Sequence, residues 1–138
     1  MRILIAPDSF KGSLTSVEVA RALAAGWRQV RPDDEITLAP LADGGEGTLA
    51  AIEAAGGWER TLTRARDPIG RWIDAPYLRS ADGTRAYVEM AAASGLSRLA
   101  GDELSPMGAT THGTGDLLLA AMAAGARHVV LGIGGSAT

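Results

Sequence analysis

The 138-residue sequence contains no cysteine, only one lysine and few aromatic residues, which make up 4% of the chain. The lack of cysteine excludes disulfide bonds and thiolate metal sites. No apolar run is long enough to cross a bilayer, because the longest, at residues 117–126, is broken by Gly125. The N-terminal residues become acidic too soon for a signal peptide. We therefore expect a soluble, cytoplasmic protein that does not bind a membrane.

The charged residues show no excess of positive charge. The formal net charge is −3, and 12 of the 13 Lys and Arg residues are arginines. The arginines between residues 60 and 71 alternate with acidic, threonine and apolar residues, so they form no basic stretch. This argues against a nucleic-acid partner. A hydrophobic fraction of 46% is enough for a folded core in a chain of this length.

Strand and helix patterns alternate in the first part of the chain. Thr15 and Glu18 have the spacing of a capping box, and apolar residues follow at helical intervals. The patterns predict a strand, a helix, a second strand and a second helix, over residues 2–6, 15–31, 35–39 and 48–55. This order is typical of a parallel sheet covered by helices, so the predicted fold class is α/β.

The pattern changes near residue 60. Two alternating segments flank a turn with an Asp82-Gly83 hairpin signal, which predicts an antiparallel meander inserted after the parallel start. A helix at 116–124 and a strand at 128–132 follow. We therefore assign residues 1–60 to the first part of one α/β lobe and residues 61–138 to the start of a second.

The last predicted strand leads into a glycine-rich loop at residues 132–137. Such a loop normally precedes a helix, and its amides then bind an anion at the helix N-terminus. No helical pattern follows it, so we expect the sequence to be the N-terminal part of a longer protein, with a frayed C-terminus as the alternative.

The first candidate functional loop contains the single lysine. Asp8, Ser9, Lys11 and Gly12 directly follow the first predicted strand and precede the first helix. Many α/β enzymes place phosphate-binding groups at this position. A lysine ammonium is a compact charge that can stay with a phosphoryl group. The alternative is that Lys11 is simply an exposed surface residue of a loop without a function.

The second candidate loop contains two carboxylates, Asp43 and Glu46, on either side of Gly44 and Gly45. Carboxylates at the end of a parallel strand can hold Mg²⁺ or accept a proton from a substrate hydroxyl. The alternative is that Asp43 stabilises a turn and Glu46 interacts with the helix dipole. We favour a functional role, because both loops leave the same edge of the predicted sheet, where α/β proteins bind ligands.

Two further loops combine glycines with hydroxyl groups. Residues 110–115 contain three threonines before a predicted helix, and residues 132–137 fit the G-x-G-x-x-A dinucleotide pattern. We predict phosphate or nucleotide contacts from Thr111, Gly113, Thr114, Gly134, Gly135 and Ser136. Thr114 can instead cap the helix. His112 is not expected to be catalytic, and His128 is interpreted as structural.

The remaining motifs exclude some classes of enzyme. No G-x-x-x-x-G-K-[ST] sequence and no protein-kinase signature occur in the chain. Glu89, among small residues at the end of a predicted strand, has two interpretations. Its side chain could point into a cleft, but we favour an exposed acid on an edge strand.

Five segments, in this order and at this spacing, make the chain resemble the bacterial glycerate kinases. They are residues 7–13, 42–47, 89–96, 110–115 and 132–138. The resemblance covers the whole chain, although at position 112 the family usually has tyrosine where this sequence has His112. Members of the family are much longer and have two α/β lobes, one of them flavodoxin-like, with the active site between them.

The resemblance implies phosphorylation of D-glycerate with ATP and Mg²⁺, with the 2-hydroxyl favoured as the acceptor. Lys11 is then the cation for the transferring phosphoryl group or the glycerate carboxylate, and Asp43 is the catalytic base or a Mg²⁺ ligand. Substrate contacts are expected from Asp8, Ser9, Gly44, Gly45 and Glu46. We expect residues 1–138 to be inactive alone, and the resemblance assigns no oligomeric state. The alternative function is a nucleotide-binding oxidoreductase that uses the terminal G-x-G-x-x-A loop.

Overall fold

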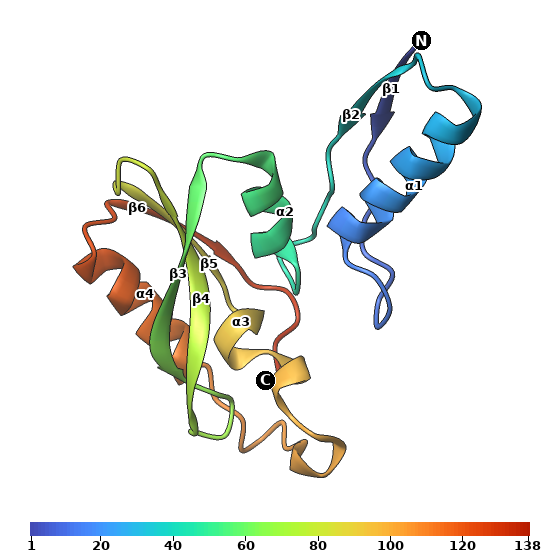
Figure 1. Ribbon diagram of the computed structural model, residues 1–138. Helices are drawn as coiled ribbons and strands as arrows, with labels where there is room; N and C mark the ends of the chain where they lie inside the picture. Colours follow the sequence, from blue (N-terminus) through green and yellow to red (C-terminus); the bar gives the residue numbers. More distant parts are fainter.

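The computed structural model describes residues 1–138 and contains two separate sheets (Figure 1). The first sheet has two parallel strands, β1 (Arg2–Ile5) and β2 (Glu35–Leu38), which are connected by helix α1 (Ser16–Val30). The second sheet has four strands and carries the remaining helices. None of the helices is long and apolar enough to span a bilayer.

Helix α1 begins at the predicted capping box. The Thr15 hydroxyl accepts a hydrogen bond from the Glu18 amide at 3.2 Å, and the Glu18 carboxylate accepts one from the Thr15 amide at 2.8 Å. These two bonds satisfy amides that the first helical turn leaves without partners. Ala20 and Ala24 of α1 then pack on Ile5 of β1, which joins the helix to the first sheet.

The second sheet combines antiparallel and parallel pairing. Its strands are β3 (Trp58–Arg66), β4 (Trp72–Ser80), β5 (Arg85–Glu89) and β6 (His128–Gly132), in that spatial order. The first three form an antiparallel meander, and β6 pairs in parallel with β5. The predicted fold class, a parallel β-α-β start followed by an antiparallel meander within an α/β protein, is confirmed.

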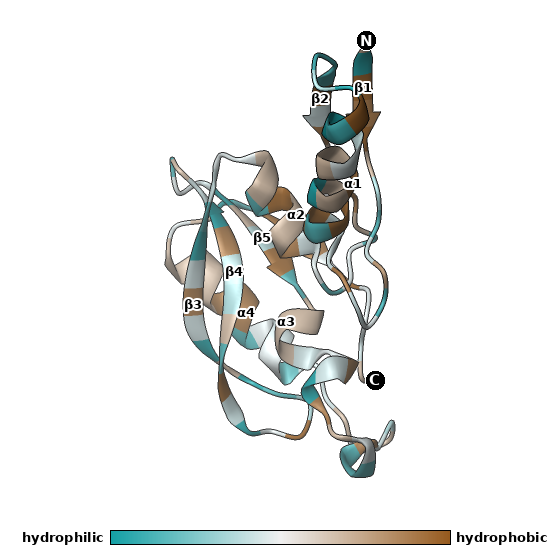
Figure 2. Ribbon diagram, turned by 45° about the vertical axis from the view of Figure 1, so that its right-hand side comes forward, coloured by the Kyte–Doolittle hydropathy of each residue, from teal (hydrophilic) through white to brown (hydrophobic).

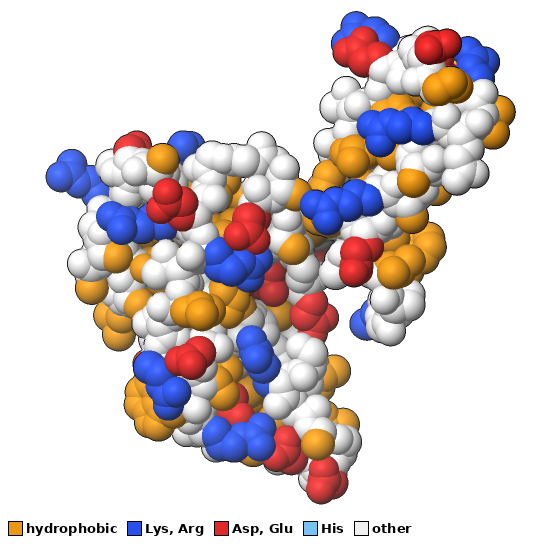
Figure 3. All heavy atoms as spheres, viewed as in Figure 1, with side chains coloured by type: hydrophobic (Ala, Val, Ile, Leu, Met, Phe, Trp, Pro, Cys, Tyr) orange, Lys and Arg blue, Asp and Glu red, His pale blue; other side chains and the backbone are white.

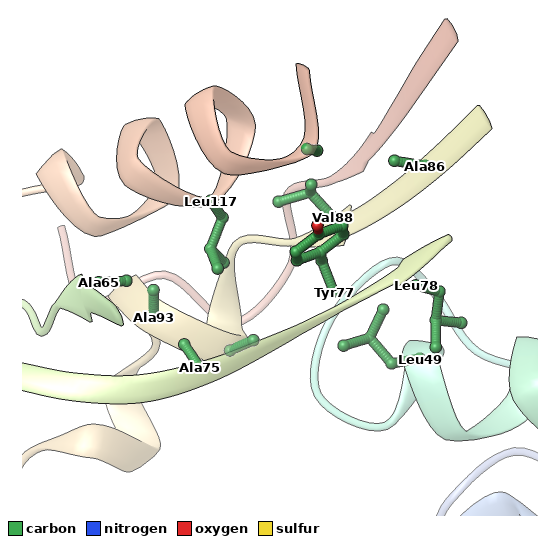
Figure 4. Close-up of a cluster of buried hydrophobic side chains, with 11 residues drawn as sticks. Leu49, Ala65, Ala75, Tyr77, Leu78, Ala86, Val88, Ala93 and Leu117 are labelled. Atoms are coloured by element: carbon green, nitrogen blue, oxygen red, sulfur yellow. The ribbon is translucent and has the colours of Figure 1, made fainter. Parts of the chain in front are cut away.

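Helices cover both faces of the second sheet. The helices are α2 (Thr48–Ala55), α3 (Ala91–Ser94) and α4 (His112–Ala123), with 3₁₀ turns at Leu96–Arg98 and Gly101–Glu103. Leu117 of α4 and the side chains of Tyr77 and Val88 belong to one buried cluster, and Leu49 of α2 lies beside Leu78 on the other side of β4 (Figure 4). Colouring by hydropathy shows apolar stretches along β1 and β5 and mixed polar and apolar turns in α1 (Figure 2).

The change from one sheet to the other falls between β2 and β3. Helix α2 packs on the second sheet through Leu49, although it precedes residue 60. Residues 39–47 therefore connect the two sheets in the structure. The division into lobes at residue 60 stays a prediction for the longer protein.

A backbone contact holds this connection against the second sheet. The Gly134 amide donates a hydrogen bond to the Gly44 carbonyl at 3.1 Å. A Cβ atom on Gly134 would lie 2.7 Å from the backbone N and Cα of Gly45, and one on Gly132 would lie 2.6 Å from the Gly44 carbonyl oxygen. Only glycine allows the two chain segments to approach this closely.

We expect Gly134→Ala to destabilise the protein, because the new methyl group meets backbone atoms that cannot move independently. The free energy of unfolding should fall by about 1–3 kcal/mol, the usual effect of overpacking. Urea unfolding of the full-length protein measures this change. The control is Gly26→Ala, at an open position inside α1, which should be neutral or stabilise the helix by up to about 1 kcal/mol. Equal stability of both variants would contradict the proposed close contact.

Candidate functional site

The loop after β1 presents Lys11 at the tip of a tight turn. The amide of Phe10 donates to the Leu14 carbonyl at 2.9 Å, and the amides of Ser13 and Leu14 donate to the Phe10 carbonyl at 2.8 and 3.1 Å. Gly12 has a φ of +79°, which this turn requires and which side chains other than glycine rarely adopt. These bonds hold the loop in one shape while the Lys11 side chain stays exposed.

The loop after β2 ends at the N-terminus of α2. The Asp43 carboxylate accepts a hydrogen bond from the Gly45 amide at 2.9 Å, and the Thr48 hydroxyl donates to the Gly45 carbonyl at 2.7 Å. Asp43 therefore does stabilise a turn, as the alternative interpretation of this loop predicted. Its carboxylate is exposed, so a turn role and a chemical role are compatible.

These first two loops enclose a pocket of about 280 Å³. Asp8, Ser9 and Lys11 line it from the first loop, and Glu46 and Gly47 line it from the second. Asp43, Gly44 and Gly45 do not line this pocket. The structure thus brings together Lys11 and Glu46 from two parallel strands, and it places Asp43 outside the cavity that they share.

The terminal glycine loop packs against the second loop. A Cβ atom on Gly135 would lie 3.3 Å from the carboxyl carbon of Glu46, so the Glu46 side chain lies next to this backbone. Ser136 forms an isolated β-bridge with Gly95, and the Leu96 amide donates to the Gly135 carbonyl at 2.9 Å. The glycines of the G-x-G-x-x-A pattern therefore contact protein rather than an open dinucleotide groove, which does not favour the oxidoreductase alternative.

The loop at residues 110–115 does not reach the pocket between the first two loops. Thr114 is buried, and its hydroxyl donates to the Ser94 hydroxyl at 2.9 Å. Gly113 is buried against the Arg66 carbonyl, whereas Thr111 is exposed just before α4. The expected open hydroxyl at Thr114 is thus used for packing. A phosphate contact from Thr111 stays a prediction.

Glu89 differs most from its sequence interpretation. It is only 5% exposed, because β5 lies between β4 and β6 and is not an edge strand. Its carboxylate accepts a hydrogen bond at 2.9 Å from the amide of Leu49, in the first turn of α2. Burial raises the pKa of Glu89, the Leu49 amide opposes this rise, and the nearby charge of Glu46 adds to it. The expectation of an exposed edge acid was wrong, and the missing information was the distant strand β6.

The carboxylates of the site suit a Mg²⁺ ion that is also bound by substrate phosphates. They do not form a metal site whose ligands all come from the protein. No group of three or more His, Cys, Asp or Glu side chains is arranged to hold a metal. Asp8 and Glu46 line one pocket, and Mg²⁺ usually needs only one or two carboxylates in addition to substrate phosphates and water. Asp43, the predicted metal ligand, is exposed. It lies between the pocket-lining residues Ala42 and Glu46 in the sequence, but it does not line the pocket itself.

Comparison with known proteins gives closely related sequences. The chain is 44% identical over 138 residues to "Glycerate 2-kinase" of Escherichia coli (strain K12), and covers 36% of that protein. It is 45% identical over 136 residues to "Glycerate kinase" of Halalkalibacterium halodurans, again covering 36%. The chain therefore spans about a third of the length of these relatives.

A solved structure shows the same arrangement. The "Crystal structure of putative glycerate kinase 2 from Salmonella typhimurium LT2" matches 99% of this chain with a TM-score of 0.81 and 43% sequence identity, over 37% of its own length. The model of the glycerate kinase family matches residues 3–138. From the first strand to the last residue, this chain belongs to the glycerate kinase family.

Proposed function

We propose that the full-length protein carrying this chain transfers the γ-phosphoryl group of ATP to D-glycerate and forms 2-phosphoglycerate. The observation that carries the proposal is the pocket between the first two loops, which the single lysine and Glu46 both line, in a chain of the glycerate kinase family. A relative named "Glycerate 2-kinase" supports the choice of the 2-hydroxyl. Phosphoryl transfer depends mainly on positioning and on neutralising charge, and this pocket offers groups for both tasks.

Lys11 is the cation that we assign to the transferring phosphoryl group. It is exposed at the tip of a well-fixed turn, so its ammonium group can follow a phosphate without rearranging the backbone. Asp8, Ser9 and Glu46 surround the same cavity, with carboxylates that a nucleotide-bound Mg²⁺ can use. When bound, Mg²⁺ would neutralise charge on the phosphate oxygens.

Asp43 is the proposed base or Mg²⁺ ligand. Only one of its carboxylate oxygens accepts the hydrogen bond from Gly45, which leaves the second for a substrate hydroxyl or a metal. Gly44 and Gly45 form the turn that presents this carboxylate. The Gly134 amide is already bonded to the Gly44 carbonyl, so Gly135 and Ser136 are the residues of the terminal loop whose amides we assign to anionic groups.

The reaction itself is tested by product analysis. The full-length protein is incubated with D-glycerate and Mg·ATP, ADP release is measured, and ³¹P NMR distinguishes 2-phosphoglycerate from 3-phosphoglycerate. We expect 2-phosphoglycerate from the full-length protein and no ADP release above background from residues 1–138 alone, since this chain supplies only part of the family's length. Turnover by residues 1–138 would contradict the second expectation. Binding of NADH in place of Mg·ATP would instead support the oxidoreductase alternative.

Replacing the lysine tests the phosphoryl contact. Lys11→Ala should lower kcat by about 10²–10³-fold, as expected when a charge that stabilises the transition state is removed. Lys11→Arg keeps the charge but not its compact geometry, so it should recover only part of the activity. The control is Arg28→Ala, at an exposed cation in the last turn of α1. A Lys11→Ala variant within a few-fold of wild type would refute the assigned role.

Replacing Asp43 by asparagine separates its two roles. The asparagine side-chain oxygen can still accept the hydrogen bond from the Gly45 amide, so the turn should persist while the negative charge is lost. Asp43→Asn should therefore lower kcat by about 10²-fold with little change in thermal stability. Glu46→Gln, at the side chain that lines the pocket, serves as the comparison. Wild-type kcat in Asp43→Asn would leave Asp43 as a turn residue only.

A further inference from the structure

A second pocket, of about 270 Å³, lies beside the first and shares Glu46 and Gly47 with it. It opens between α2 and the segment from α3 to Arg98, above the face of the second sheet that α2 covers. The register explains this location: Arg60 of β3 pairs with Leu78 of β4, whose side chain packs on Leu49 of α2. Arg60 thus faces the α2 side of the sheet and lines the pocket.

The lining of this second pocket combines two cations with two anions. Arg60 and Arg98 supply guanidinium groups, and Glu46 and Glu89 supply carboxylates. In Figure 3 this region, between the positions of α2 and α3 in Figure 1, shows blue and red side chains close together around a hollow. Because cationic and anionic side chains line the same cavity, the pocket matches a ligand that carries both an anionic group and hydrogen-bond donors.

The two guanidinium groups are held in place by the protein. Arg98 donates to the Ala92 carbonyl at 2.6 Å through one terminal nitrogen, so its other N–H groups are available. Arg60 donates to Glu53 at 2.6 and 3.0 Å through Nε and one terminal nitrogen, which leaves its second terminal nitrogen without a hydrogen-bond partner in the chain. Fixed guanidinium groups bind carboxylates well, because their N–H groups match the two carboxylate oxygens.

We propose that this second pocket is the subsite for the small hydroxy acid, with its carboxylate on Arg98 and Arg60 and its hydroxyl groups directed to Glu46. The inference rests on the proposed function and makes it more specific. Ionised carboxylates only accept hydrogen bonds, so Glu46 selects a hydroxyl donor, while a neutral polyol would leave Arg98 without an anion, since its one partner in the chain is the Ala92 carbonyl. A ligand with a second negative charge would be repelled by Glu46 and Glu89.

Glu46 and Gly47 line both pockets, so ligands in the two pockets would lie next to each other. With the hydroxy acid in the second pocket, its acceptor hydroxyl lies at Glu46, and Lys11 is left for the phosphoryl group in the first pocket. The hydroxyl oxygen forms a bond to the γ-phosphorus of ATP, the bond from that phosphorus to the bridging oxygen breaks, and ADP leaves. The hydroxyl proton passes to Glu46, the carboxylate beside it, and then to water, which leaves Asp43, outside both pockets, its other proposed role as a Mg²⁺ ligand.

Calorimetric titration of the full-length protein tests the subsite without catalysis. D-Glycerate, glycerol and Mg·ATP are each titrated into wild type, Arg98→Ala, Arg98→Lys and Arg60→Ala. We expect Arg98→Ala to weaken D-glycerate binding at least tenfold, Arg98→Lys to weaken it less, and Mg·ATP affinity to remain within twofold. Glycerol should bind more weakly than D-glycerate to wild type. The matched control is Arg64→Ala, on the same strand as Arg60 but paired with Asp74 outside the pocket.

The outcomes separate this inference from the proposed function. Wild-type affinity for D-glycerate in both Arg98→Ala and Arg60→Ala, in a protein that phosphorylates D-glycerate, would overturn the subsite and leave the function intact. If wild type neither binds nor phosphorylates D-glycerate, the proposed function fails and the subsite fails with it. Should Arg98→Ala also lose Mg·ATP affinity through misfolding, Arg60→Ala decides: a tenfold loss specific to D-glycerate supports the subsite, and wild-type affinity overturns it.

Discussion

The close backbone contact between Gly44–Gly45 and Gly132–Gly134 is the constraint on which the arrangement of the site depends. The first segment follows β2 of the two-stranded sheet, and the second begins at Gly132, the last residue of β6 in the four-stranded sheet. The hydrogen bond from Gly134 to Gly44 therefore joins the ends of two strands that belong to different sheets. Because no side chain separates these backbones, Glu46 is held against Gly135 and faces both pockets.

Glu89 of β5 stabilises the N-terminus of α2, directly after the loop that contains Asp43 and Glu46. A buried carboxylate is costly unless it is hydrogen-bonded, and here it receives the Leu49 amide at the N-terminus of α2, where helix amides lack partners and negative charge is favourable. Helix α2 has no side-chain cap at its own N-cap residue, Gly47, so Glu89 provides from the sheet what the local sequence does not. The loop with Asp43 and Glu46 is thus fixed at one end by Glu89 and at the other by Gly134.

Local sequence signals predicted the elements that depend on local interactions. The capping box located α1, and the glycines after residue 55 located the end of α2. Helix α4 begins at His112, four residues before its predicted start. The sequence did not reveal this first turn, because Gly113 and Gly115 are weak helix formers. The turn is helical in the structure because Gly113 packs on the Arg66 carbonyl of β3. The four-residue helix α3 was not predicted, since a short run of alanine and serine has no helical period to detect.

The parts of the site that were not predicted depend on contacts between distant residues. The burial of Glu89 follows from parallel pairing with β6, about forty residues later in the chain, which no pattern around Glu89 reveals. The second pocket likewise needs Arg60 from a strand and Arg98 from a 3₁₀ turn. By contrast, the meeting of Lys11 with the second loop was predictable, because both follow neighbouring parallel strands at the same edge of a sheet.

The most direct test of the central claim is a crystal structure of the full-length protein with D-glycerate and a non-hydrolysable ATP analogue. The account predicts the γ-phosphate within hydrogen-bonding distance of the Lys11 ammonium group and the glycerate carboxylate beside Arg98, with Glu46 between the two ligands. Both ligands bound away from the loops at residues 8–13 and 41–47 would contradict it.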